Sequence, residues 1–274
     1  MKAEALIALP VFNEAKHLPD VLMELLPYQG RTLFVNDGST DSSSGLIRSS
    51  GYCVVDFPAN QGLSAVYRAV FAYATANDYQ SIIFLDSDGQ HEISNIPAFE
   101  HLIQNNNMVC GNRFWNPDIV PEAKIASNLF AVLLHKEITG ALLPDVACGF
   151  RAFRKTENWP KIGGSFGYEV IYNTLLSNCL SNDLPEFVRV KAIYDHQNEY
   201  FTRCEEVESL LVAMGRFDKK GVTSVLKAQF AAGSDLKIKL SGLDFHAVKR
   251  NGHYIFSTDD QKARQLFKDI NKLS

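Results

Sequence analysis

The fold is decided by residues 5–41, which have the sequence ALIALPVFNEAKHLPDVLMELLPYQGRTLFVNDGSTD. Within this stretch, the apolar runs 5–9 and 32–36 have the length of buried strands, and residues 17–26 between them have the apolar spacing of a helix. Each run is followed directly by polar residues. Strand, helix and strand in this order are typical of a parallel sheet covered by helices.

The same alternation continues to about residue 113 and predicts an α/β fold with a mostly parallel sheet. The further elements expected here are strands at Cys53–Phe57, Ser81–Leu85 and Met108–Cys110, and helices at Asp41–Ser50, Ser64–Asn77 and Ser94–Asn105. In such sheets, ligands bind beyond the carboxyl ends of the strands. We therefore expect the site in the loops that follow the strands.

The pattern changes after Arg113, where strands become less frequent. The elements expected in this half are helices at 124–139 and 168–178, strands at 147–154 and 186–194, two helical segments within 205–230, a hairpin from Leu236 that turns at Asn251-Gly252, and a helix at 259–273. This half therefore ends in a small helical and hairpin extension.

Composition narrows the class of protein. The 274 residues suffice for one α/β domain with an extension, and the net charge of −4 gives no reason to expect a nucleic acid partner. The five cysteines contain no CxxC pair and indicate reduced thiols. Residues 1–4 lead directly into a strand, and the apolar stretch 125–134 is shorter than the ~20 residues of a membrane span. We expect a cytoplasmic protein, at most peripheral to the cytoplasmic face of a membrane.

The most specific motif is Asp86-Ser87-Asp88-Gly89-Gln90-His91, which closes the strand at 81–85. Two carboxylates one residue apart, followed by an amide, can converge on a hard divalent cation, and Mg²⁺ and Mn²⁺ both favour oxygen ligands. The alternative is an acidic turn, because Asp-Ser-Asp-Gly is also good turn chemistry.

Three other strand ends carry polar groups, at Pro10-Val11-Phe12-Asn13-Glu14, Asn36-Asp37-Gly38-Ser39-Thr40-Asp41 and Asn60-Gln61-Gly62-Leu63-Ser64. Amide and carboxylate acceptors such as Asn13 and Asp37 suit the base and ribose of a nucleoside. The alternative for Asp41 is helix capping, and Ser64 is interpreted as a helix N-cap.

These four motifs, in this order and spacing, resemble those of family 2 glycosyltransferases with the GT-A fold, a Rossmann-like sheet flanked by helices. The resemblance implies a nucleotide-sugar donor and Mg²⁺ or Mn²⁺. It also implies metal ligands at Asp86, Asp88 and Gln90, and donor-binding residues at Pro10, Asn13, Glu14, Asp37, Asn60, Gly62, Asp86 and Ser87.

Gly111-Asn112-Arg113 and residues 145–151, DVACGFR, are similar to the subgroup of dolichyl-phosphate and polyprenyl-phosphate sugar synthases. In that subgroup the arginine after the fifth strand binds phosphate, and Arg113 is the matching position. The residues implied in acceptor or phosphate binding are Arg113, Lys124, Ser127, Asn128, Gly149 and Arg151. Two positions depart from the pattern: Cys148 replaces a serine, and Lys124 replaces an arginine and so lacks its bidentate fork.

The resemblance also assigns domains and catalytic candidates. Residues 1–200 form the expected catalytic domain, with a nucleotide-sugar half at 1–115 and an acceptor half at 116–200, and residues 201–274 form the extension. The catalytic candidates are Asp88, Arg113, Asp145 and Glu169. Asp145 could instead fix a turn, and Glu169 could serve the dipole of a helix start.

The expected reaction is inverting transfer from a GDP-sugar or UDP-sugar to a polyprenyl phosphate. The alternatives are a soluble or cell-surface glycan acceptor and an inactive nucleotide-sugar-binding protein. A nucleotidyltransferase would need a glycine-rich basic loop where residues 10–14 stand. The amphipathic stretches 127–138 and 207–230 could contact a membrane, although such stripes are more often core faces. The oligomeric state is open.

Overall fold

The chain forms two compact units in the computed structural model, which describes residues 4–155, 169–191 and 202–273. The first unit contains Met1–Gly111, Cys148–Phe166 and Asp183–Ile193, and the second contains Asn112–Ala147, Gly167–Asn182 and Tyr194–Ser274. The second unit therefore joins segments of the expected acceptor half with the C-terminal extension.

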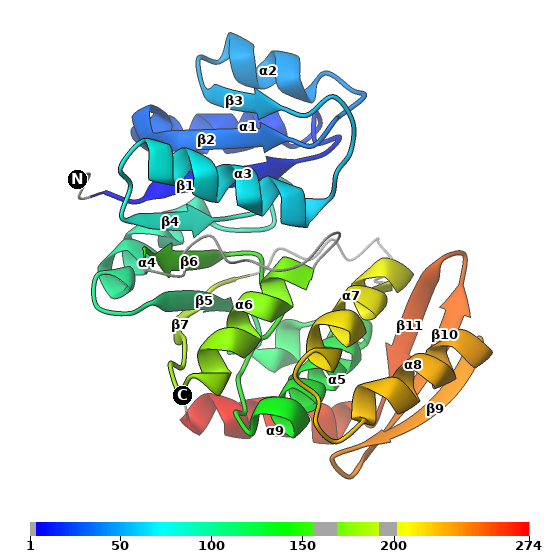
Figure 1. Ribbon diagram of the computed structural model, residues 1–274. Coiled ribbons are helices and arrows are strands. Elements are labelled where there is room, and N and C mark those ends of the chain that lie inside the picture. Colours follow the sequence, from blue (N-terminus) through cyan, green and yellow to red (C-terminus); the bar gives the residue numbers. More distant parts are fainter. Residues whose placement is uncertain (1–3, 156–168, 192–201, 274) are drawn as a thin grey trace. The chain divides into compact units, whose positions relative to one another are not determined.

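The first unit is built on a seven-stranded sheet (Figure 1). Its strands are β1 Leu6–Val11, β2 Thr32–Asn36, β3 Cys53–Asp56, β4 Ser81–Phe84, β5 Met108–Asn112, β6 Arg151–Arg154 and β7 Glu186–Arg189. The order of the strands is β3-β2-β1-β4-β6-β5-β7. The neighbours β3/β2, β2/β1 and β1/β4 are parallel, whereas β6 is antiparallel to both β4 and β5. The expected mostly parallel α/β sheet is confirmed.

Helices cover both faces of this sheet. They are α1 Leu18–Glu24, α2 Ser43–Ser49, α3 Leu63–Ala76 and α4 Ile96–Ile103, with 3-10 turns at Leu26–Arg31 and Ile93–Asn95. Ile7 of β1 lies in one apolar cluster with residues of α1 and α4, such as Leu22 and Phe99. On the other face, Tyr67 of α3 stacks on Phe84 of β4 with ring centroids 3.9 Å apart. Buried strands with continuous apolar runs are what such double coverage requires.

The second unit has a helical layer and a four-stranded antiparallel sheet (Figure 1). Its elements are a 3-10 turn at Pro117–Ile119, α5 Glu122–Thr139, α6 Glu169–Leu180, β8 Thr202–Arg203, α7 Cys204–Gly215, α8 Val222–Ala232, β9 Asp235–Leu240, β10 Leu243–Arg250, β11 His253–Ser257 and α9 Asp260–Leu273. Phe130 of α5 packs against Phe245 and Phe256 of this sheet, with ring centroids 5.6 and 5.2 Å apart. The apolar stripe at 127–138 is therefore mainly a core face.

The predicted turn at Asn251-Gly252 is confirmed, with φ of 46° and 79°. The prediction of a single hairpin after Leu236 was wrong, because a second turn at Ser241-Gly242 creates a third strand. The Ser-Gly dipeptide is itself a turn signal, which the prediction of a single hairpin did not use. The strand expected at 147–154 begins only at Arg151, and the one expected at 186–194 ends at Arg189.

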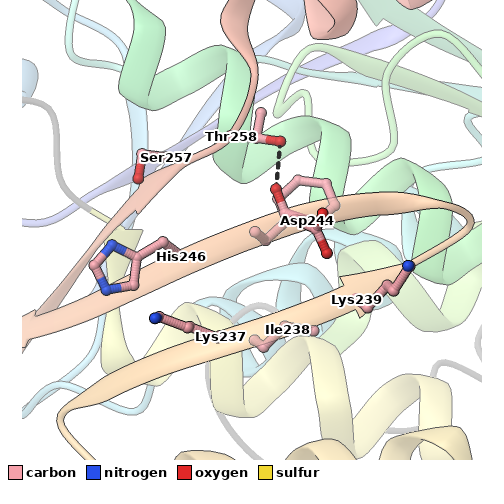
Figure 2. Close-up of a pocket in the computed structure, with 8 residues that line it drawn as sticks. Lys237, Ile238, Lys239, Asp244, His246, Ser257 and Thr258 are labelled. Atoms are coloured by element: carbon pink, nitrogen blue, oxygen red, sulfur yellow. Dashed lines mark hydrogen bonds between the residues drawn. The ribbon is translucent and has the colours of Figure 1, made fainter.

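The outward face of the second sheet carries an open polar pocket (Figure 2). Strand β9 alternates exposed and buried residues, which places Lys237 and Lys239 on this face, and the register pairs them with His246 and Asp244 of β10. The residues of the donor and phosphate motifs do not line this pocket. Within the described part of the chain, none of the helices combines the length and apolarity needed to cross a membrane.

Candidate functional site

Two carboxylates lie together just after β4. Burial raises the pKa of Asp88 most, and the neighbouring Asp86 carboxylate raises it further. Two groups lower the pKa of Asp88: the backbone amide of Gln90, which donates to Asp88 Oδ1 at 2.9 Å, and His91. The His91 ring is buried, and its Nε2 lies 3.1 Å from Asp86 Oδ2. Two negative charges that destabilise one another are a suitable place for a cation.

Gly149 makes room for the Asp86 carboxylate. A Cβ atom on Gly149 would lie 2.3 Å from Asp86 Oδ2 and 2.6 Å from Oδ1, closer than such atoms can approach. Gly149 was expected to contact an acceptor or phosphate, and the structure places it beside an expected metal ligand. This contact could not be predicted from the sequence, because the two residues belong to segments far apart in the chain.

These residues fit a divalent cation. Among the described residues, no three His, Cys, Asp or Glu side chains are spaced to hold a metal without help. Mg²⁺ usually takes only one or two protein carboxylates and completes its shell with water and substrate phosphates. Asp86 and Asp88 match that requirement, and the exposed Gln90 is available on the same loop.

The loops after β1 and β4 are joined by a hydrogen bond, in which Ser87 Oγ donates to the Pro10 carbonyl at 2.7 Å. Pro10 is tolerated in this central strand because β1 pairs with β4 only over Leu6–Ala8, before the proline. Two of the residues predicted to bind the donor are thus brought together at the ends of adjacent strands.

Asp37 holds the loop after β3. Its carboxylate accepts hydrogen bonds from the amides of Gln61 and Gly62 at 2.7 and 2.9 Å, and its side chain is buried. The neighbouring Gly38 has a φ of +71°, and a Cβ atom on it would lie 2.4 Å from the backbone of Ala59. Asp37 and Gly62 are therefore brought together, and this arrangement requires glycine at position 38.

Asn13 joins the loop after β1 to the loop after β2. It has a positive φ of 59°, its amide donates to Ser39 Oγ at 2.9 Å, and its Oδ1 accepts from the amide of Thr40 at 2.8 Å. Glu14 lies 2.8 Å from His17, and Asn60 is exposed. These residues thus lie in linked loops at the carboxyl ends of the strands.

Asp41 and Ser64 were both interpreted as residues that cap a helix start. Asp41 Oδ1 accepts the amide of Ser43, the first residue of α2, at 3.0 Å, so its carboxylate satisfies a helix-start amide as expected, although Ser42 holds the N-cap position. The interpretation of Ser64 as an N-cap was wrong, because α3 begins at Leu63 and Gly62 precedes the helix. The glycine's positive φ of 82° lets the chain enter the helix two residues earlier than the serine suggests.

Arg151 is fully buried on β6 and donates from Nε to the carbonyl of Cys148 at 2.5 Å. Burial raises the pKa of Tyr67, which the Arg151 guanidinium opposes and the Asp86 carboxylate reinforces. Arg151 therefore lies in the interior that supports Asp86 and the turn at 148–150. It does not present a surface to the phosphate group that we expected it to bind.

In the second unit, Arg113 forms a bidentate pair with Asp145. Nε donates to Oδ2 at 2.8 Å and Nη2 donates to Oδ1 at 2.9 Å, and the Asp145 side chain is fully buried. Asp145 Oδ1 also accepts the amide of Ala147 at 3.0 Å, which is the turn role considered for this residue. Both carboxylate oxygens are thus engaged, and the pair fixes the plane of the guanidinium.

The expected phosphate-binding residues of α5 lie beside this pair. Arg113 Nη2 donates to Asn128 Oδ1 at 3.3 Å, and Asn128 Nδ2 donates to the carbonyl of Lys124 at 3.0 Å. Ser127 Oγ donates to the same carbonyl at 3.4 Å. Glu169 begins α6, and its side chain lies outside the described residues.

Solved structures share this fold. Glucosyl-3-phosphoglycerate synthase from Mycobacterium tuberculosis, in complex with Mn²⁺, UDP-glucose and phosphoglyceric acid, superposes with a TM-score of 0.54 and 16% sequence identity, over 79% of this chain and 81% of that chain. The chain therefore has the GT-A fold.

The family model of glycosyl transferase family 2 matches residues 6–194, and the chain belongs to that family of glycosyltransferases. An uncharacterised protein of Methanocaldococcus jannaschii is 26% identical over 71% of this chain and 90% of its own length. Undecaprenyl-phosphate 4-deoxy-4-formamido-L-arabinose transferase of Pseudomonas syringae pv. syringae is 27% identical over 55% of this chain. The chain spans about half of that transferase, 47% of its length.

Proposed function

We propose that this glycosyltransferase moves a sugar from a nucleoside diphosphate sugar to a polyprenyl phosphate, with inversion at the anomeric carbon. An oxygen of the acceptor phosphate forms the new bond to that carbon. The bond to the diphosphate breaks, and the leaving nucleoside diphosphate takes its electron pair. Asp86, Asp88 and Gln90 would hold Mg²⁺ or Mn²⁺, which supplies positive charge for the leaving diphosphate.

The observation that carries the donor half of the proposal is the pair of carboxylates at Asp86 and Asp88 on one loop, where burial and the Asp86 charge raise the pKa of Asp88. A divalent cation bound together with the donor diphosphate would offset the repulsion between these two carboxylates. The linked loops that carry Asn13 and Asp37 offer amide and carboxylate groups to a nucleoside.

The acceptor half of the proposal rests on the hydrogen bonds that Asp145 accepts from Arg113. A sugar hydroxyl needs a general base to remove its proton, whereas a phosphate monoester is already ionised near pH 7. Both oxygens of Asp145 accept hydrogen bonds from Arg113, so this carboxylate is poorly suited to act as a base. An ionised phosphate acceptor needs no such base, and Arg113 offers it a cation.

Product analysis tests the proposal. The protein is incubated with radiolabelled UDP-glucose or GDP-mannose, Mn²⁺, and detergent-dispersed undecaprenyl phosphate, with EDTA and an Asp88→Ala variant as controls. We expect label in the organic extract only with cation and the unaltered protein. No label in the organic extract in the presence of cation contradicts the acceptor assignment, and lipid product that persists in EDTA contradicts the cation assignment.

A further inference from the structure

The C-terminal helix α9 contacts the loop that carries Arg113, and both lie in the second unit. Asn271 of α9 makes the central contacts: its Oδ1 accepts from Asn112 Nδ2 at 2.6 Å, and its Nδ2 donates to the carbonyl of Phe114 at 2.8 Å. Asn271 therefore holds the residue before Arg113 and the residue after it.

The loop itself completes this network. Asn112 Oδ1 accepts the amide of Phe114 at 2.9 Å, so the side chain of Asn112 bridges α9 and the loop backbone. The Phe114 ring stacks on Phe267 of α9 with centroids 4.7 Å apart, and both rings are fully buried. These contacts fix the backbone on both sides of Arg113.

Farther along the loop, Arg264 of α9 donates from Nη1 to the carbonyls of Pro117 and Val120, at 3.0 Å for the latter. Asp260, on the same helix, accepts from Arg264 Nε at 2.7 Å and fixes the guanidinium. One face of α9 thus binds the backbone of residues 112–120 at several points. Ordinary packing of a terminal helix would bury apolar side chains without this series of polar bonds to one loop.

We propose that α9 is a positioning element of the transferase site, and that Asn271 is a positioning residue that sets the Arg113 guanidinium for phosphate. The proposal rests on the proposed function, in which Arg113 binds phosphate. Asn271 aligns the loop from one side while Asp145 aligns the guanidinium from the other. This gives the segment beyond residue 194, where the family match ends, a part in the reaction.

The test compares variants of the full chain by calorimetric titration with farnesyl phosphate, a phosphate monoester like the proposed acceptor. Arg113→Ala should weaken binding by about 10-fold or more, since hydrogen bonds to charged groups are lost, and Asn271→Ala by about 3- to 10-fold. Two controls should bind normally: Lys272→Ala, an exposed neighbour that pairs only with Asp269 among the described residues, and Asp218→Ala, which removes a helix-capping side chain elsewhere in the second unit.

Amide hydrogen exchange on the same variants measures the loop independently of any ligand. Asn271→Ala should speed exchange at Arg113 and Phe114, whose amides are hydrogen-bonded, and Asp218→Ala should not. Unchanged exchange in Asn271→Ala overturns the positioning role. Faster exchange with normal farnesyl phosphate binding overturns the link to phosphate. If Arg113→Ala itself binds normally, the assigned function of Arg113 fails and the inference fails through that premise.

Discussion

Gly149 and Asp86 occupy one small space, because a methyl group on Gly149 would lie 2.3 Å from the Asp86 carboxylate. Gly149 is in the turn before β6 and Asp86 is in the loop after β4, and the two strands are antiparallel neighbours. The position of the carboxylate that we assign to the cation therefore requires that residue 149, just before the adjacent strand, has no side chain.

The Gly149→Ala variant is expected to fold and to lose cation-dependent nucleotide binding. The added methyl meets the end of a movable side chain, so Asp86 shifts and overpacking costs about 1–3 kcal/mol. Calorimetric titration of UDP and GDP with Mn²⁺ should show an affinity at least about 10-fold lower.

A matched control for this prediction is Gly45→Ala in α2, where a Cβ atom would meet no described atom within 4 Å. Alanine is favoured over glycine in a helix, so this variant should be more stable by about 0.5–1 kcal/mol and should bind nucleotide normally. Normal binding by Gly149→Ala would show that the position of Asp86 is unimportant.

The Asp88→Asn variant is expected to be more stable than the unaltered protein without metal. It removes one of two carboxylates that repel each other, and its free energy of unfolding in EDTA at pH 7 should rise. Mn²⁺ at 100 times its Kd should stabilise the unaltered protein by about 2.7 kcal/mol and leave the variant unchanged. Urea denaturation with and without Mn²⁺ measures both effects; equal stabilisation of the two proteins would contradict the assignment.

Gly38→Ala is expected to lose stability by about 2–5 kcal/mol. The left-handed backbone disfavours alanine by about 1–2 kcal/mol, and contact with the backbone of Ala59, which cannot move aside easily, adds about 1–3 kcal/mol. Gly140→Ala, also at a positive φ but with no described atom within 4 Å of the added Cβ, should lose only the first amount. Equal losses of stability in urea denaturation would show that Gly38 does not lie close to the backbone of Ala59.

The Asp218 carboxylate makes the free energy of unfolding depend on pH. Burial raises the pKa of this carboxyl, but hydrogen bonds from Thr223, Lys220 and Gly221 outweigh burial and lower the pKa below its usual 3.8. A lowered folded pKa means that the stabilisation is complete above about pH 4 and is lost as the pH falls through the folded value. Asp218→Ala should therefore cost about 1 kcal/mol at pH 7 and less at pH 2–3, as measured by urea denaturation. A loss that does not change with pH would contradict this account.

Much of the first unit could be predicted from sequence, because its signals are local. The apolar runs of β1, β2 and β4 and the polar residues after them mark both the strands and the candidate site. The antiparallel insertion of β6 between β4 and β5 could not be predicted, because strand order depends on pairing between distant segments with similar apolar patterns.

The parts of the site that the sequence did not indicate are contacts between distant segments. Gly149 matched a motif, but its closeness to Asp86 depends on the register of β4 and β6. Asn271 lies in an amphipathic helix with no motif, and its bonds to Asn112 and Phe114 appear only in the folded chain. Arg151, by contrast, was expected from the resemblance to bind the acceptor or a phosphate, and its side chain is buried.

The central claim is that Asp86 and Asp88 hold a divalent cation together with a nucleoside diphosphate. Its most direct test is the titration of UDP and GDP into the unaltered protein and Asp88→Ala, each with Mn²⁺ and with EDTA. We expect one nucleotide to bind the unaltered protein tightly with Mn²⁺ and at least about 10-fold more weakly in the other three conditions. Mn²⁺-dependent binding that is undiminished in Asp88→Ala would contradict the claim.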